Sequence, residues 1–358
     1  MLDPDTLRTR LTDWLPARVG APSVTITDLT PPSGTGYSSE TLLFTATFDV
    51  DGEANERRYV VRLKPTRPGV FPEYDIDLQH DVMAALGAKT TVPVPEMLWQ
   101  EHDAEVLGSE FFVMAHVHGR VPTDNPPYTL GGWILDEPEE RRRTMHTAAL
   151  DVLCDIHRLD PFNALGDVAN RLRRGLDAEL AYYESFFEWA AQGRPQPVAE
   201  RAWEWVHANR PKGDQQIGLS WGDSRISNMI FGDDLRPAAV LDWEMVSLGD
   251  PQMDLGWWLF LDRHFTEGMS VSQPAGFLSR AETIGRWEQA LGRPAVDVDF
   301  YEMYAGFRFA VVMMSLTRLF IADGLMPADT DFDRNNTVTQ CLAPMLGMDP
   351  PGDFTPVW

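Results

Sequence analysis

Two acidic side chains and one amide are spaced between residues 219 and 254 in a way that suits phosphate chemistry. Asp223 stands five residues before Asn228, and Asp242 follows fourteen residues later. Mg²⁺ prefers hard oxygen ligands, commonly one or two from the protein together with substrate phosphates. Asp223 would then be free to accept a proton from an attacking hydroxyl group. Each residue alone could be an ordinary turn or capping residue, but the joint spacing favours a magnesium–nucleotide site.

The segments that must position these residues change in character along the chain. Alternating β-rich runs and turn sequences predict strands at 24–30, 40–50, 57–64, 92–101 and 109–117. Helical spacing of apolar residues predicts helices at 3–18, 73–87, 139–160, 170–192, 196–209, 252–267, 276–291 and 299–322. We therefore expect a smaller lobe, residues 1–117, with a five-stranded sheet and one inserted helix. A larger helical lobe, residues 118–358, would hold the candidate catalytic loop.

Composition excludes several classes of protein. The chain has 358 residues, more than the roughly 250–300 that one hydrophobic core usually serves. Its net charge of −24 repels nucleic acid and anionic membranes, and its two cysteines fit neither a disulfide framework nor a metal site. The start has no signal-peptide pattern, and the longest apolar stretch, 304–324, contains Arg308 and Arg318 and so predicts a buried helix. We expect a cytoplasmic protein without a membrane or nucleic-acid partner.

Several sequence blocks carry a family resemblance. The runs LSWGDSRISNMIF, AVLDWE and GDPQMDLGWWL resemble the H-G-D-x4-N, hydrophobic-D-W/F-E and G-D-P-x2-D-L signature of the aminoglycoside phosphotransferase family. The blocks SGTGYSSETLLF, YVVRLKP, FFVMAHVHGR and LCDIHRLDP resemble more closely the phosphotransferase group related to kinase domains fused to acyl-CoA dehydrogenases. The resemblance spans roughly residues 25–322 and implies an α+β, protein-kinase-like bilobal fold.

The resemblance also implies roles for individual residues. Asp223 would be the catalytic base, and Asn228 and Asp242 would hold Mg²⁺. A phosphate loop would bind the nucleotide through backbone that glycine lets approach closely and through hydroxyl donors. Its residues would be Gly34, Gly36, Ser38 and Ser39.

The remaining nucleotide-binding roles fall on two later strands. Arg62 lies where the kinase strand carries its phosphate-pairing lysine, and Lys64 follows on the same strand face, so either could bind the α- and β-phosphates. Met114 would lie beside adenine, and the Ala115 and Val117 backbones would bind its edge, although the same run could simply be a core strand.

The chain departs from the family pattern at three positions. Trp221 replaces the histidine of H-G-D, Arg62 replaces the strand lysine, and Gln79 stands where a helix glutamate normally pairs with the strand cation. A neutral amide can form a hydrogen bond to Arg62 but no ion pair, and Asp77 is a possible substitute.

Two classes of function fit these residues. The first is a small-molecule kinase that moves the γ-phosphoryl group of Mg-ATP (or GTP) to a hydroxyl group of an aminoglycoside-type or hydroxyacyl-type acceptor. The second, favoured by Trp221 and Gln79, is a nucleotide-binding regulatory module with little or no transfer activity. The acceptor, the choice between ATP and GTP, and the oligomeric state are left open by the sequence.

Overall fold

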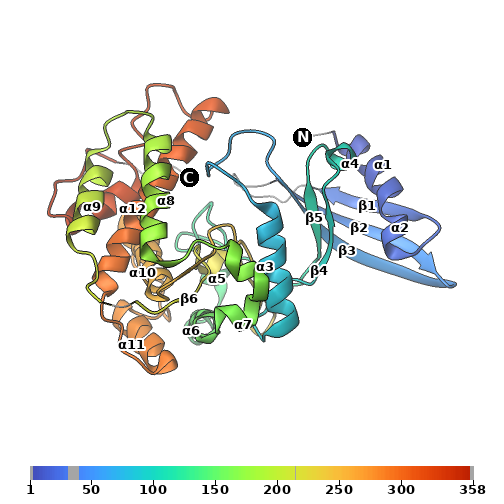
Figure 1. The fold of residues 1–358 in the computed structure, drawn as a ribbon, viewed down its shortest axis with the longest axis horizontal. Helices are drawn as coiled ribbons and strands as arrows, with labels where there is room; N and C mark the ends of the chain where they lie inside the picture. The colour runs from blue at the N-terminus through green and yellow to red at the C-terminus, as the bar shows by residue number, and fades with distance from the viewer. Residues whose placement is uncertain (1–2, 31–39, 214, 355–358) are drawn as a thin grey trace.

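The computed structural model describes residues 3–30, 40–213 and 215–354. Within these residues, a five-stranded antiparallel sheet stands at one end and a mainly helical part makes up the rest (Figure 1). The strands are β1 (Val24–Thr30), β2 (Glu40–Val50), β3 (Glu53–Leu63), β4 (Met97–Glu101) and β5 (Phe111–Ala115), in the order β1-β2-β3-β5-β4. The arrangement confirms the predicted α+β, bilobal class. The lobe boundary at residue 117 remains a prediction.

Helices cover the two faces of this sheet. Those of the smaller part are α1 (Pro4–Trp14), α2 (Pro16–Val19), α3 (Ile76–Lys89) and α4 (Ala104–Leu107). Figure 1 shows α3 between the sheet and the helical part, whereas α1, α2 and α4 lie on the far side. The helix predicted at 3–18 is two helices because Pro16 lacks the N–H that a continuous helix would need there.

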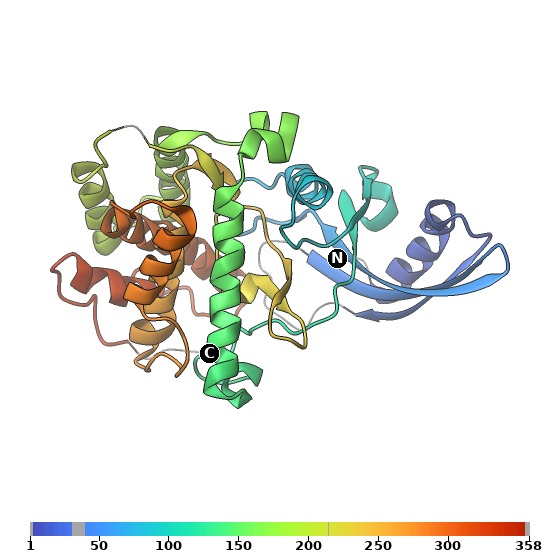
Figure 2. The same cartoon turned by 90° about the horizontal axis from the view of Figure 1, so that it is seen from below.

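The larger part is built mostly of helices, seen from below in Figure 2. Its longer helices are α6 (Glu139–Arg158), α8 (Gly175–Ala191), α9 (Pro197–Ala208), α10 (Gln252–Thr266), α11 (Arg280–Leu291), α12 (Val298–Ala322) and α13 (Thr337–Met345). Short helices are α5 (Trp133–Asp136), α7 (Pro161–Leu165) and three 3₁₀ turns at Gly166–Arg171, Ile226–Asn228 and Glu267–Met269. Two small antiparallel pairs join β6 (Gly218–Ser220) to β9 (Ser247–Gly249) and β7 (Met229–Phe231) to β8 (Pro237–Val240).

Some boundaries differ from those that the sequence predicts. Strand β3 begins at Glu53, before the predicted 57, because β2 and β3 pair up to the turn at Asp51 and Gly52, both in the left-handed region. Helix α11 begins at Arg280 because Ser279 and Glu282 form a capping box there. Helix α13 was not predicted.

Strand β3 presents alternate residues to two hydrophobic cores. Tyr59, Val61 and Leu63 pack with α1 in the smaller core, whereas Val60 packs against the larger core shared with the helical part. Because successive strand residues point to opposite faces, Arg62 lies on the same face as Val60. The strand therefore directs this cation toward the helical part.

Helix α12 lies in the centre of the helical part. Among the described residues, it is the one helix long and apolar enough to cross a membrane, but sixteen of its residues are buried inside the fold. Gly256 of α10 lets the two helices touch, since a Cβ atom at this position would lie 2.3 Å from the backbone carbonyl carbon of Tyr301. This close contact fixes α10, which lies beside the candidate catalytic loop.

Candidate functional site

The loop after β6 carries the predicted catalytic acid. Asp223 is nearly buried, and its carboxylate and main-chain carbonyl both accept hydrogen bonds from the Asn228 side-chain amide, at 2.7 Å to Oδ2 and 3.1 Å to the main-chain oxygen. Gly222 has φ +95°, and a Cβ atom there would lie 2.3 Å from the Met245 carbonyl oxygen. The turn therefore requires glycine, and the loop that follows it brings Asp223 and Asn228 together.

The hairpin of β7 and β8 places Asp242 beside the same loop. Met229 pairs with Val240, and the Leu241 amide donates to the Asn228 carbonyl at 2.8 Å. Asp242 itself has φ 59°, a left-handed conformation uncommon for aspartate. Strand pairing thus turns a separation of fourteen residues in sequence into proximity in space.

Trp221 supports this arrangement from the buried side. Its indole N–H donates to the main-chain carbonyls of Leu241 at 2.9 Å and Asp242 at 3.1 Å, and its side chain is fully buried. Trp221, which stands where the resembled signature has histidine, therefore links the candidate catalytic loop to the segment that carries Asp242. The substitution is compatible with an ordered loop.

Arg62 reaches Asp242 across the two parts of the fold. The Nη2 atom of Arg62 lies 3.9 Å from Asp242 Oδ1, and neither atom makes a hydrogen bond within the described part of the chain. Burial raises the pKa of Asp242, Arg62 opposes that shift and the nearby Asp223 adds to it. Burial outweighs the opposing charges of Arg62 and Arg225, so a further cation beside Asp242 would favour its charged form.

The donor set at this point fits a magnesium ion. Because Nδ2 of Asn228 is held by Asp223, its Oδ1 is left as an oxygen ligand, and Asp242 contributes a buried oxygen without a hydrogen bond. Among the described residues, no three His, Cys, Asp or Glu side chains cluster as metal ligands. A cation here would therefore depend on two protein oxygens and on phosphate oxygens, as magnesium commonly does.

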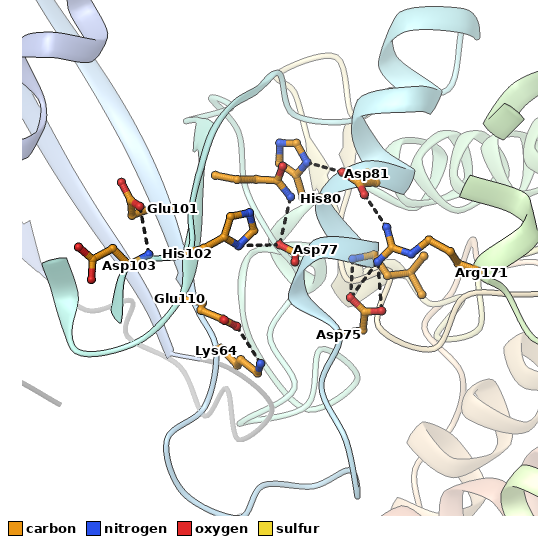
Figure 3. A network of polar contacts seen from close by, with 12 residues as sticks. Lys64, Asp75, Asp77, His80, Asp81, Glu101, His102, Asp103, Glu110 and Arg171 are labelled. Atoms are coloured by element: carbon orange, nitrogen blue, oxygen red, sulfur yellow. Dashed lines mark hydrogen bonds and ion pairs between the residues drawn. The ribbon is translucent and has the colours of Figure 1, made fainter. Parts of the chain in front are cut away.

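The other predicted cation and its substitute partner lie elsewhere. Lys64 forms an ion pair with Glu110 at 2.8 Å (Figure 3). Asp77 lies 3.7 Å from His102 and accepts a hydrogen bond from Gln100, so its contacts are with β4 and the residue after it, not with Arg62. Arg171 of the helical part forms ion pairs with Asp75, the residue just before α3, and with Asp81 within α3.

The predicted adenine-binding segment covers the end of β5 and the residues after it. Met114 is buried, and its strand face belongs to the larger core. The Ala115 amide donates to the Glu96 carbonyl at 2.9 Å, so this N–H is already used within the fold. After Val117, Gly119 packs against Phe231 of β7, where a Cβ atom would lie 2.5 Å from the Phe231 carbonyl oxygen. The predicted phosphate-loop residues Gly34, Gly36, Ser38 and Ser39 lie outside the described residues.

Asp254 accepts four hydrogen bonds, three from residues at the start of the candidate catalytic loop and one from His157 of α6. Its fully buried carboxylate accepts from Ser220 Oγ at 2.7 Å, the Trp221 amide at 2.7 Å, the Gly222 amide at 2.9 Å and His157 Nε2 at 3.0 Å. Burial alone would raise the pKa of Asp254, but the hydrogen bonds from His157, Ser220 and Gly222 outweigh it, and the pKa is lowered. The carboxylate is therefore a structural anchor beneath the loop.

Two further side chains contact Asp223, and the sequence did not predict either contact. Arg225 Nε lies 3.0 Å from Asp223 Oδ2, and its Nη1 forms an ion pair with Asp124 of the Pro- and Gly-rich segment. Trp257 Nε1 donates to Asp223 Oδ1 at 2.8 Å. Arg225 lies two residues after Asp223, so its closeness in sequence could have indicated the contact. Trp257 lies on a helix that tertiary structure brings close to Asp223.

His264, near this site, makes stability dependent on pH. Burial and then the charge of Arg225 lower the pKa of His264 from 6.5 to about 3. Between these values the unfolded chain binds a proton that the folded chain does not, so stability should fall as pH decreases, by up to about 1.4 kcal/mol per pH unit. Urea unfolding at pH 7, 6 and 5 should show a shallower pH dependence for His264→Phe. The exposed-residue variant His102→Phe should match the wild type, and an unchanged slope in His264→Phe would contradict the prediction.

Comparisons with known proteins agree with this geometry. The profile described as the phosphotransferase enzyme family matches residues 36–291. A probable acyl-CoA dehydrogenase of Arabidopsis thaliana is 27% identical over 300 residues, which cover 78% of this chain and 35% of that protein. The chain thus spans about a third of that curated relative's length.

Solved structures share the fold. A protein of Ralstonia eutropha crystallised as a candidate aminoglycoside phosphotransferase superposes with a TM-score of 0.65 at 22% identity, over 94% of this chain and 95% of that one. A thermostable variant of aminoglycoside phosphotransferase APH(4)-Ia, in complex with ADP and hygromycin B, gives 0.57 at 15% identity, over 94% and 98%. At these identities the likeness establishes the fold.

Proposed function

Since the chain belongs to the phosphotransferase enzyme family, we propose that it is a kinase that transfers the γ-phosphoryl group of ATP to a hydroxyl group of a small-molecule acceptor. The observation that carries this proposal is the meeting of Asp223, Asn228, Asp242 and Arg62 at one place between the sheet and the helical part. Phosphoryl transfer depends mainly on positioning and on stabilisation of charge, and these four side chains can supply both.

Each residue has a proposed task. Asp223 orients the acceptor hydroxyl and accepts its proton as the oxygen attacks phosphorus. Arg62 binds the α- and β-phosphates, a role for which it is better placed than Lys64, whose charge is paired with Glu110. Asn228 Oδ1 and Asp242 would hold Mg²⁺, which when bound neutralises phosphate charge.

The base and the phosphate chain of ATP are assigned to the smaller lobe, proposed as residues 1–117. The adenine edge would meet the Ala115 carbonyl and the Val117 amide beside Met114. Gly34, Gly36, Ser38 and Ser39 remain the proposed phosphate loop.

For the acceptor we propose a hydroxyacyl compound. This rests on similarity to a chain named as an acyl-CoA dehydrogenase, of which the present chain matches one portion. An aminoglycoside is the competing acceptor class, since a structural neighbour binds hygromycin B. The proposed cytoplasmic location rests on the sequence.

Thermal unfolding with nucleotide tests the proposed site. Mg-ATP at about 100 times its Kd should stabilise the wild type by about 2.7 kcal/mol, and both a chelator and the substitution Asp242→Ala should remove most of this shift. Mg-GTP in place of Mg-ATP tests the choice of nucleotide. No shift with either nucleotide would contradict the site.

An acceptor screen then tests transfer. Hydroxyacyl thioesters and aminoglycosides would be incubated with the protein and Mg-ATP, and phosphorylated product measured by mass spectrometry. Transfer to a hydroxyacyl compound supports the full proposal. Nucleotide binding without transfer to any hydroxyl acceptor would favour the regulatory module instead.

A further inference from the structure

The two oxygens of the Asp223 carboxylate have different neighbours. Oδ2 receives hydrogen bonds from Asn228 and Arg225. Oδ1 receives one from the indole N–H of Trp257 at 2.8 Å, within the described part of the chain. Rotation of a carboxylate about its last side-chain bond is only weakly restricted by its own torsional preference, so these contacts decide which way each oxygen faces.

The Trp257 ring is itself held firmly. Trp257 is buried, and the centroids of its ring and the Phe309 ring lie 5.7 Å apart. The Cζ atom of the Arg308 guanidinium lies 4.7 Å from the centroid of the Trp257 ring. Arg308 is also buried, and its Nη2 donates to the carbonyl of Gly222, the residue before Asp223. One buried cation therefore braces both the indole and the turn that carries the proposed base.

An indole N–H is a suitable group for this contact. It donates a hydrogen bond but cannot accept one, and it carries no proton that titrates near neutral pH. It can fix a carboxylate without competing for the proton that an acceptor hydroxyl releases.

We propose that Trp257 is a positioning residue for phosphoryl transfer, whose indole N–H orients the Asp223 carboxylate toward the acceptor hydroxyl. The inference rests on the proposed function, because it assigns Trp257 a task in that reaction. The proposal adds a side chain on α10, 34 residues after Asp223 in the sequence, to the residues that position the candidate base.

The chain provides a matched control in the next residue. Trp258 is also buried on α10, but its Nε1 has no hydrogen-bond partner in the described residues, and its ring packs against His146 at 5.5 Å. Trp257→Phe and Trp258→Phe remove the same atoms from neighbouring positions. Only the first removes a hydrogen bond to Asp223.

The first measurement is steady-state kinetics of Mg-ATP turnover, with water as acceptor where no hydroxyl acceptor has been found. Trp257→Phe should lower kcat about tenfold, the factor expected for losing one hydrogen bond to a charged group, with the KM for ATP within about twofold. Trp258→Phe should leave both constants within about twofold of the wild type. Equal kcat values for the two variants, or a fall in kcat matched by a rise in KM, would overturn the proposal.

The second measurement detects the hydrogen bond without any turnover. In ¹⁵N-labelled protein, the indole signals of Trp257 and Trp258 are assigned by their loss in the two phenylalanine variants. Asp223→Ala should shift the Trp257 signal and leave the Trp258 signal in place. An unmoved Trp257 signal would overturn the inference, whatever the activity.

The two measurements separate the two proposals. Failure of the wild type to transfer phosphate to any acceptor, water included, would refute the proposed function. The indole signals would still decide whether Trp257 holds Asp223.

Discussion

Asp223→Ala should lower the rate of phosphoryl transfer by about 10²–10⁴-fold, the usual contribution of a positioned general base. The variant loses the carboxylate that accepts hydrogen bonds from Asn228, Arg225 and Trp257. Steady-state kinetics with the acceptor found by screening, or with water, measure the effect. Binding of Mg-ATP should persist, since Arg62 and Asp242 remain, and its midpoint shift in thermal unfolding should resemble that of the wild type.

Asp233→Ala provides the control for this prediction. Asp233 is an exposed acid in the turn between β7 and β8, ten residues after Asp223 and in the same hairpin region. Its removal changes the net charge by the same amount and should leave turnover unchanged. A rate for Asp223→Ala within threefold of the Asp233→Ala rate would rule out Asp223 as the base.

The sequence was most informative where the site depends on contacts between residues that are close together in the chain. Asp223, Asn228 and Asp242 are brought together by one tight turn and one short hairpin. Their spacing along the sequence was therefore enough to indicate that they belong to one site. Strand periodicity likewise predicted that Arg62 and Lys64 share one strand face, because alternation along a strand needs no knowledge of the rest of the fold.

Contacts between elements could not be read in the same way. The resemblance indicated Gln79 as a partner of Arg62, with Asp77 as a possible substitute. In the structure, Arg171 of the helical part forms ion pairs with Asp75 and Asp81 of the same segment. The structure pairs Arg62 with Asp242 instead. No local pattern encodes such a choice, because it is settled by how two separate elements pack.

The buried side chains that support the site show most clearly that contacts between separate elements cannot be predicted from local sequence patterns. Arg308 interrupts an apolar run, which indicated a buried helix but not the contact with Gly222, 86 residues away. Trp257 and Trp258 are adjacent tryptophans in the sequence, yet one indole N–H donates to a carboxylate and the other has no hydrogen-bond partner among the residues that the structure describes. Their different places around α10 distinguish them, and these depend on how α10 packs in the fold.

Asp254→Ala should have the largest effect on stability of any substitution near the site. The change leaves four donors from Ser220, Trp221, Gly222 and His157 without their acceptor in a fully buried place. Each orphaned buried donor costs about 1–3 kcal/mol, so the free energy of unfolding should fall by more than about 4 kcal/mol. That is a large share of the roughly 5–15 kcal/mol that holds a typical domain folded.

Urea unfolding at pH 7 is the right measurement, because the pKa of Asp254 is lowered in the folded state. Because the pKa of Asp254 is lowered, the contribution of Asp254 to stability is fully present above the unfolded value of 3.8 and is lost as pH falls through the folded value.

Asp299→Ala is the matched control. The Asp299 side chain is 89% exposed and pairs with Arg280 at the surface, so its loss should lower the free energy of unfolding by less than about 1 kcal/mol. If Asp254→Ala does not fold, Asp254→Asn keeps the shape while turning an acceptor into a donor, and it too should be destabilised well beyond the control. Equal stability of the Asp254 and Asp299 variants would mean that the four hydrogen bonds do not hold the loop, and the ordered turn that presents Asp223 would then need another cause.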